Sequence, residues 1–555
     1  MTRAVSYARD ALWLCLPWLL LVLVLACLRP MAVPDEGRYG EIGRWMWISG
    51  DWMVPRLDGI PFFHKPPLLY WLEALSVGLL GPQVWAVRLV PMLHAALMLI
   101  GLYTVTRQWA GEALARRAAL MLGSSLAFLV GGQYVNHDML VACWISLAIL
   151  CFGWSFASGE RPHVGWARAG FVACGLGILS KGLIGLALPG LVLLLWIGWT
   201  RQWGKILRLP WFSGLALFCL ITVPWFALAE QHHPGMLGYL FGTHQFGRFT
   251  ATTFNNARPW WFYGVAVLVL WGMWLPWTLV AAWQAFRRQS LGGLESLGMS
   301  SSMEQVTKLR SLAWIWMVAI LGFFSIPNSK LLGYALPVVP ALAVLSALGW
   351  SSMQGWRWQR WLWRGLLVLG VVLAVGANHV AGQFIDKFSS RDVAAALACR
   401  AGPADPVSVL GGYPYDLPFL SRRSAPMQVM QDWAGLQGKL GDEWRSELLD
   451  GARFDAQAAA VLVRSRHCRP WLVSQVSGWW WRTRPCPNWR QRWVLLSDVS
   501  RAATGPCTAV RARANKPTAR LELLHAKARS ALERPEAPKY KRLSSGHDQG
   551  GDQGG

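Results

Sequence analysis

The segment Ala11–Leu28, ALWLCLPWLLLVLVLACL, carries no charged side chain along its whole length. A run of this length and composition is typical of a helix that crosses a lipid bilayer. The composition of the chain agrees, since 54% of its 555 residues are hydrophobic and 15% are charged, which is too apolar for a soluble protein of this length. No clear small-residue cleavage site follows the segment, so we expect an uncleaved first span and not a signal peptide.

Working outward from this segment, further stretches that are largely free of charge repeat along the chain. We expect an α-helical polytopic membrane protein with about 11 to 13 transmembrane helices. Besides the first, the expected spans are Val84–Val105, Ala118–Gly131, Met139–Phe156, Gly170–Leu179, Leu183–Trp199, Trp211–Ala229, Trp261–Phe286, Leu312–Ile326, Leu331–Trp350 and Gly365–Val380.

The formal net charge of +24 would suit a nucleic-acid-binding protein, but the basic residues gather in alternate connections between spans. By the positive-inside rule these connections are cytoplasmic, which also places the N-terminus inside and the C-terminal region outside. We therefore expect no nucleic-acid partner. The residues that carry this interpretation are Arg107, Arg116, Arg117, Arg161, Arg168, Arg201, Lys205, Arg208, Arg287, Arg288, Lys308, Arg310, Arg357, Arg360 and Arg364.

The pattern predicts three parts: a membrane domain over residues 1–380, a small external α/β domain over 381–500, and a disordered basic tail over 501–555. Within the membrane domain, residues 29–82 form a long outer loop. Its stretches Glu36–Ile48 and Leu68–Leu80 read as two interfacial helices, the first ending at Gly50. Four cysteines, whose pairing the sequence leaves open, lie in the external region, where disulfides are permitted: Cys399, Cys468, Cys486 and Cys507.

Carboxylates lie next to two of the expected spans on the outer side. Asp35 and Glu36 come just after the first span, and Asp138 stands just before the fourth. A carboxylate here could act as a general base or orient a cation. The alternative is that these residues start helices, because acidic side chains favour helix N-termini.

Cationic side chains accompany these carboxylates. Arg38 and Lys65 lie in the first loop, and Lys330 stands one turn before Tyr334 at the start of the tenth span. Fixed positive charge at the headgroup plane suits a lipid phosphate and would stabilise a departing one. Ordinary headgroup binding or snorkelling would explain the same pattern.

His64 and His244 are far apart in the sequence but are expected on the same outer face. Imidazole is a common ligand of zinc and also of manganese. We therefore consider a divalent metal, with zinc, manganese or magnesium as candidates, although two histidines without a fixed spacing are a weak signal.

Several motifs in this arrangement resemble a known family. The first loop contains Pro34-Asp35-Glu36-Gly37-Arg38-Tyr39 and closes with Phe63-His64-Lys65-Pro66. Further motifs follow in order: Asp138-Met139-Leu140, Ser180-Lys181-Gly182, Thr243-His244-Gln245-Phe246-Gly247-Arg248-Phe249 and Ser329-Lys330-Leu331-Leu332 with Tyr334. Together they resemble the lipid A 4-amino-4-deoxy-L-arabinose transferases, which are bacterial members of the protein mannosyltransferase superfamily.

The resemblance implies an inner-membrane, type C glycosyltransferase. Such an enzyme moves a sugar from an undecaprenyl phosphate donor to lipid A or another envelope glycan on the periplasmic face. It would make Asp35 and Asp138 catalytic and His244, with His64, a metal ligand. It would also assign the donor phosphate to Arg38, Tyr39, Lys65, Lys330 and Tyr334.

Two residues depart from the family pattern: His64 stands where these transferases have glutamate, and Gly37 where a hydroxyl residue is usual. Within the enzyme class, transfer to protein Ser or Thr is the alternative. Outside it, a lipid or sugar transporter remains, but a transporter gathers polar groups near mid-membrane and often repeats its halves. Here the polar groups lie at one face and no repeat is evident.

Overall fold

The structure, a computed structural model, describes residues 2–247, 257–287, 303–353, 357–410, 412–433 and 444–464. The chain divides into two compact units, Met1–Leu495 and Leu496–Gly555, and the second lies wholly outside the described residues. So do the predicted basic tail and three of the external cysteines, Cys468, Cys486 and Cys507. The division into domains at residues 380 and 500 stays a prediction.

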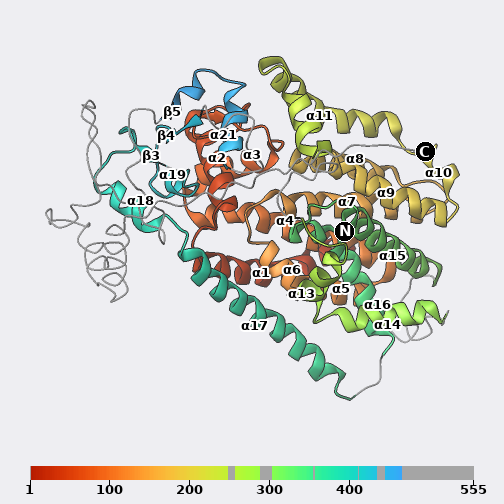
Figure 1. Cartoon of the computed structure of the whole chain (residues 1–555). Coiled ribbons are helices and arrows are strands. Elements are labelled where there is room, and N and C mark those ends of the chain that lie inside the picture. The colour runs from red at the N-terminus through yellow and green to blue at the C-terminus, as the bar shows by residue number, and fades with distance from the viewer. Residues whose placement is uncertain are drawn as a thin grey trace, which may run out of the picture. The chain divides into compact units, whose positions relative to one another are not determined.

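Within the described part, seven helical segments are long and apolar enough to cross a membrane (Figure 1). The expected class of α-helical polytopic membrane protein is confirmed. The seven are Arg9–Leu28 of α1 (Thr2–Leu28), α4 (Val84–Ala110), α7 (His137–Ala157), α11 (Trp211–His232), α15 (Met303–Ser325), Leu332–Ser351, which joins η3 (Leu332–Val338) to α16 (Val339–Ser351), and α17 (Gln359–Asp386).

The other expected spans are also helical in the described part of the chain, and some of these helices are short or broken. α13 (Phe262–Trp271) and α14 (Leu275–Phe286) bend by 117° and count at most as an eighth span. α5 (Glu112–Ser124) and α6 (Leu126–Gly131) separate at Ser125, whose hydroxyl caps α6 by accepting from the Phe128 N–H. The remaining helices here are α8 (Val164–Lys181), α9 (Ile184–Trp199) and the single turn α10 (Trp203–Ile206).

The first loop has the two expected helices, α2 (Asp35–Ser49) and α3 (Leu68–Leu80). Gly50 ends α2 with a φ of 70°, a left-handed conformation that glycine adopts without a Cβ penalty. The extended stretch between the helices folds back on itself as the short antiparallel pair β1 (Arg56–Leu57) and β2 (Ile60–Pro61). The sequence thus predicted the order of elements in this loop.

After α17 the chain forms a small α/β region, as expected. Its parallel sheet has the order β3-β4-β5, formed by Ser408–Leu410, Gln428–Gln431 and Leu462–Arg464. The helices are α18 (Arg391–Ala398), α19 (Leu417–Leu420), α21 (Trp444–Ala452) and the turn η4 (Ala458–Val461). Cys399, at the end of α18, is disulfide-bonded.

This α/β region packs on the first loop through one buried hydrophobic cluster. Ile42 of α2 and Tyr70 of α3 share the cluster with Val429 of β4 and Leu448 of α21, and Figure 1 shows α2, α3, β4 and α21 close together. A second cluster joins Phe63 of the loop to α11 and to the π-helix η1 (Gly238–Gly247). The first loop is therefore the place where distant segments of the chain meet.

Candidate active site

Asp35 occupies the first position of α2, where the helix N-terminus favours a negative charge. Its carboxylate lies 2.7 Å from Arg38 Nη2 and accepts a hydrogen bond of 3.2 Å from the Tyr134 hydroxyl. The side chain keeps 32% of its surface exposed. Asp35 is thus a carboxylate held in place by two partners and still open to a ligand.

Glu36, the next residue, has no exposed surface. Its two oxygens accept hydrogen bonds of 2.6–3.1 Å from the guanidinium groups of Arg29 and Arg88, and further bonds from the backbone N–H groups of Ala32 and Val135. Burial acts to raise the pKa of Glu36, but the two arginines outweigh it and lower the pKa to about 2. Glu36 therefore fastens the first loop to α4 and to the segment before α7.

Arg38 contributes positive charge but is closely surrounded. Its guanidinium pairs with Asp35 and with Glu447 of α21, and it lies 5.1 and 5.2 Å from the ring centroids of Tyr39 and Tyr415. The Arg38 side chain is 12% exposed. The predicted phosphate ligand is therefore held by two carboxylates in this structure.

Tyr39 is close enough to both predicted catalytic carboxylates for their charges to act on its hydroxyl. Its ring meets the edge of His137 at 4.8 Å, and burial raises its pKa, an effect to which the negative charges of Asp35, Glu447 and Asp138 add. The phenol therefore stays protonated, so its O–H can donate a hydrogen bond. Lys65, at the end of the loop, is half-buried.

Asp138, at the start of α7, forms a second charged centre. It pairs with Lys181 at the end of α8 and accepts a 3.0 Å hydrogen bond from Asn136 Nδ2. A Cβ placed on Gly333 would collide with Asp138 Oδ2, so the backbone of η3 lies directly against this carboxylate. The Lys181 ammonium also lies 4.4 Å from the centroid of the Tyr334 ring. The structure thus joins Asp138, Lys181 and Tyr334.

Lys330, another predicted phosphate ligand, is 3% exposed. Its ammonium donates to the backbone carbonyls of Arg258 and Pro327. These bonds attach the segment before η3 to the segment before α13.

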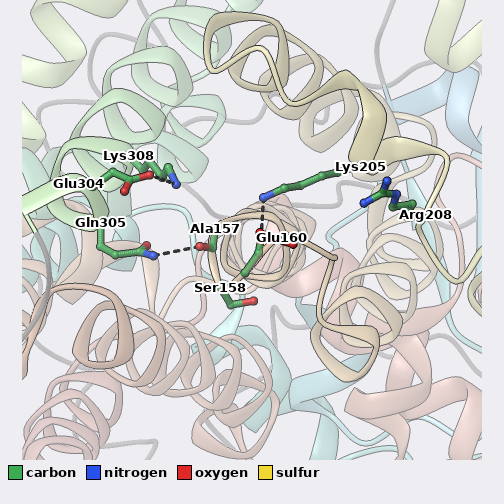
Figure 2. Close-up of a pocket in the computed structure, with 9 residues that line it drawn as sticks. Ala157, Ser158, Glu160, Lys205, Arg208, Glu304, Gln305 and Lys308 are labelled. Atoms are coloured by element: carbon green, nitrogen blue, oxygen red, sulfur yellow. Dashed lines mark hydrogen bonds and ion pairs between the residues drawn. The ribbon is translucent and has the colours of Figure 1, made fainter.

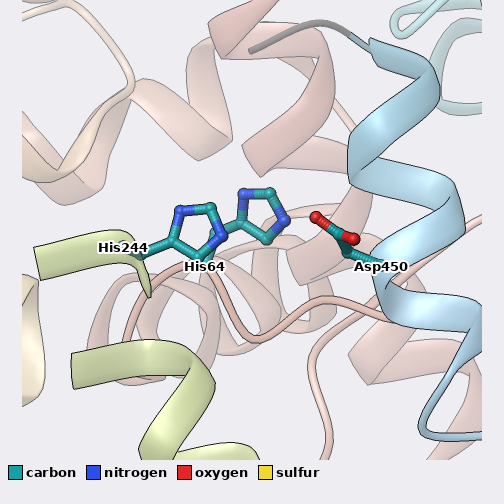
Figure 3. Close-up of side chains that lie close together, drawn as sticks. All are labelled: His64, His244 and Asp450. Carbon is teal, nitrogen blue, oxygen red and sulfur yellow. The ribbon is translucent and has the colours of Figure 1, made fainter. Parts of the chain in front are cut away.

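The two predicted metal ligands meet, together with a third residue from α21 (Figure 3). The ring centroids of His64 and His244 are 4.0 Å apart, and one ligand atom from each of His64, His244 and Asp450 lies within 4.8 Å of the others. Two imidazoles and a carboxylate form a donor set that suits zinc and leaves a fourth position open. The residues present therefore fit a divalent metal.

An outer layer of hydrogen bonds surrounds this cluster. The Tyr239 hydroxyl lies 2.9 Å from His64 Nε2 and donates to Asp450 Oδ2 at 3.2 Å. Such partners fix the orientation of ligand side chains. Next to His244, Gln245 accepts a 2.8 Å hydrogen bond from the Leu183 N–H, which ties η1 to the turn that follows Lys181.

Reasoning from the sequence did not assign Glu447, Asp450, Tyr134 or Lys181 to the site. Glu447 lies 409 residues from Arg38 in the sequence, and the separation of Asp450 from His64 is similar, so local sequence patterns could not connect α21 with the first loop. Tyr134 and Lys181 lie in short connections between expected spans on the outer side, so their position was the available signal.

A separate hollow of about 570 Å³ lies elsewhere, among basic connections predicted to be cytoplasmic, and contains Lys205, Arg208 and Lys308 (Figure 2). Lys205 donates to the carbonyls of Phe156 and Gly159, and Lys308 pairs with Glu304 at 2.6 Å. The bonds of Lys205 satisfy carbonyls at and just beyond the C-terminal end of α7. We assign this hollow no catalytic role.

Comparison with known proteins agrees with the fold. The family model of the dolichyl-phosphate-mannose-protein mannosyltransferases matches residues 9–240. An undecaprenyl phosphate-α-4-amino-4-deoxy-L-arabinose arabinosyl transferase of Pseudomonas fluorescens is 31% identical over 341 residues, covering 60% of this chain and 55% of the relative. Its counterpart in Pseudomonas savastanoi pv. phaseolicola is 31% identical over 349 residues, covering 62% and 61%. The chain thus spans less than two thirds of the length of these relatives.

The solved structures give a longer match. The crystal structure of ArnT from Cupriavidus metallidurans bound to undecaprenyl phosphate aligns with a TM-score of 0.65 and 25% identity, covering 82% of this chain and 89% of that one. The apo structure of the same protein aligns with a TM-score of 0.63 and 25% identity. The likeness therefore extends beyond the membrane half into the α/β region.

Proposed function

From the confirmed resemblance of this chain to bacterial aminoarabinose transferases, we propose that it is a membrane glycosyltransferase. It takes a sugar from an undecaprenyl phosphate donor and passes it to lipid A or another envelope glycan. The observation that carries the proposal is the contrast between neighbours in α2: Asp35 is partly exposed beside a cation, whereas Glu36 is fully buried.

The reaction we propose is an inverting transfer. Asp35 accepts the proton of the acceptor hydroxyl, whose oxygen attacks the anomeric carbon of the sugar. The bond from that carbon to the phosphate oxygen breaks, and its electron pair leaves with the lipid phosphate. Asp138 is the second carboxylate, held by Lys181.

The developing negative charge on the phosphate needs fixed positive groups and hydrogen-bond donors around it. We propose Arg38, Lys65 and Lys330 as the cations, with the hydroxyls of Tyr39 and Tyr334 as donors. Lys181 joins this group because it lies against Tyr334.

For the metal we propose zinc, held by His64, His244 and Asp450. A bound zinc ion would supply Lewis-acid stabilisation of phosphate oxygens. Tyr239 would orient His64 and Asp450 through its hydroxyl.

We also propose that the site faces the periplasm of a bacterial inner membrane, with the N-terminus in the cytoplasm and the C-terminal region in the periplasm. A cysteine introduced at exposed Ser49, in α2 of the first loop, should react with a membrane-impermeant maleimide in intact spheroplasts. A cysteine at exposed Ser158, beyond the other end of α7, should not. The reverse pattern would contradict this orientation.

The reaction is tested by the substitution Asp35→Asn in cells that lack the chromosomal gene. Mass spectrometry of lipid A and of total envelope glycans should detect a sugar addition with the wild-type gene and none with Asp35→Asn. Glu304→Gln serves as a matched control, because Glu304 is a surface carboxylate that pairs with Lys308. Full transfer by Asp35→Asn would overturn the catalytic assignment, and a sugar on protein Ser or Thr would change the acceptor.

A further inference from the structure

The surroundings of Arg38 resemble a filled anion site. Of its two terminal nitrogens, Nη2 bonds Asp35 at 2.7 Å and Nη1 bonds Glu447. With rings of Tyr39 and Tyr415 beside the guanidinium and 12% of the side chain exposed, a further anion has little access. A phosphate that is to pair with Arg38 must therefore take the place of one carboxylate.

Of the two carboxylates, Glu447 is the one that can be exchanged. Asp35 and Arg38 are three residues apart on α2, so their pairing is local, and Tyr134 also holds Asp35. Glu447 comes from α21, on a different segment of the chain, and its second oxygen accepts a 2.7 Å hydrogen bond from the Tyr415 hydroxyl. Exchange at Glu447 leaves α2 intact, whereas exchange at Asp35 would disturb the proposed base.

A carboxylate also resembles a phosphate in the way that Arg38 would recognise it. Both present oxygen acceptors that carry negative charge to the planar guanidinium. The Tyr415 hydroxyl is a donor that could serve a phosphate oxygen as it serves Glu447. The position that the Glu447 carboxylate occupies thus has the hydrogen-bond donors that an anionic lipid headgroup needs.

We infer that Glu447 occupies, in the absence of donor, the position at Arg38 that the donor phosphate takes, and so sets the affinity for the lipid phosphate. This inference rests on the proposed function. Each binding event then breaks the Arg38–Glu447 pair before it gains the Arg38–phosphate pair. Because Asp450 lies three residues further along the same helix, a shift of α21 that withdraws Glu447 would also move a proposed metal ligand.

The test is the dissociation constant of undecaprenyl phosphate for the purified full-length protein in detergent micelles. Glu447→Gln keeps the shape of the side chain but removes its charge, so Arg38 is released at lower cost. A hydrogen bond to a charged group contributes about 1.5–3 kcal/mol, which corresponds to roughly a tenfold change or more. We expect Glu447→Gln to bind the lipid phosphate about tenfold more tightly than the wild type.

A second variant acts on the same carboxylate from its other side. Tyr415→Phe keeps the ring beside Arg38 but removes a hydroxyl donor from Glu447 and from the bound phosphate alike, so it should change binding by less than Glu447→Gln does, by no more than about threefold. Undecaprenol, which has the same lipid tail without phosphate, should bind wild type and variants alike. Thermal stability of each variant in the same detergent confirms that the compared proteins are folded.

The outcomes separate the inference from the proposed function. Unchanged or weaker binding of undecaprenyl phosphate by Glu447→Gln overturns the inference, because Glu447 would then be indifferent to the phosphate or needed to position Arg38. If neither the wild type nor Glu447→Gln binds undecaprenyl phosphate saturably, the proposed function itself fails. Tightening that also appears with undecaprenol would assign the effect to the lipid tail and would equally overturn the inference.

Discussion

Replacing Glu36 by glutamine should destabilise the protein severely, whereas the equivalent change at its neighbour Asp35 should cost little stability. Glu36 is the shared acceptor of Arg29 and Arg88, which are buried to 7% and 0% exposure. A glutamine has the same size but no charge, and its amide nitrogen would face guanidinium groups where an acceptor stood. The two arginines would then carry buried positive charge without a counterion.

The expected size of the effect follows from this burial. Removing one partner of a buried ion pair costs about 3–5 kcal/mol, because the other charge stays behind uncompensated. Asp35 is 32% exposed and forms one ion pair, for which about 1 kcal/mol or less is expected. Arg88 also donates to the carbonyls of Arg29 and Pro30, which holds its guanidinium in place and prevents it from reaching solvent.

The measurement is the midpoint of thermal aggregation in detergent, followed by size-exclusion chromatography with fluorescence detection. Asp35→Asn should melt close to the wild type and lack activity, whereas Glu36→Gln should melt far lower or fail to accumulate as a monodisperse protein. A Glu36→Gln protein as stable as the wild type would refute the structural role of this clamp. A large loss of stability in Asp35→Asn would show that Asp35, like Glu36, is needed for folding.

Three further predictions concern the same loop and its partners. Burial raises the pKa of Asp58 to about 8, so the protein is most stable with respect to this group below about pH 4, and that stability is lost as the pH rises through 8. Asp58→Asn does not titrate, so it should gain stability relative to the wild type by at most about 1.4 kcal/mol per pH unit over that range. Thermal midpoints of the two proteins that run parallel from pH 5 to 8 would contradict this. Gly37→Ser should lose about 1–3 kcal/mol, because a Cβ there would stand 2.8 Å from the Asp416 backbone nitrogen; Gly376→Ala, with open space around it, is the thermal-melt control and should lose nothing. Asp450→Asn should bind zinc at least about tenfold more weakly, since mutation of residues that merely hydrogen-bond to metal ligands already lowers metal affinity 10- to 100-fold. The exposed Asp432→Asn is the control. Equal zinc content of the two variants by elemental analysis would show that Asp450 is not a ligand.

Local signals were enough to predict the first loop. Acidic residues at the start of α2, Gly50 at its end and the Pro66-Pro67 pair before α3 each act on the backbone within a few residues. The spans were predicted for a similar reason, since a bilayer requires long apolar runs. Hydropathy does not register a bend such as the 117° between α13 and α14, so the break within the expected span Trp261–Phe286 could not be predicted.

Contacts between residues far apart in the sequence could not be predicted, for a different reason. Asp35 and Glu36 have different roles because Arg88 pairs with Glu36 alone, and Arg88 lies within an apolar span that looks ordinary in the sequence. Likewise, Glu447 and Asp450 enter the site because the buried cluster of Ile42, Tyr70 and Leu448 packs α21 on the first loop. Neither the pairing of Arg88 with Glu36 nor the packing of α21 on the first loop can be predicted from the local sequence.

The position of α21 also bears on His64, the residue that departs from the family pattern. A histidine in place of glutamate removes one negative charge from the first loop, which would leave His64 and His244 as two neutral ligands. Asp450 returns a carboxylate to the same cluster from another segment, so the donor set still offers a single negative charge to a divalent metal. If the metal is zinc, His64 and Asp450 should therefore be coupled: His64→Glu in the wild type adds a second carboxylate, whereas in Asp450→Asn it replaces the missing one. We expect His64→Glu to restore zinc binding in the Asp450→Asn background, and a double variant as deficient as Asp450→Asn alone would show that the two positions do not share one ion.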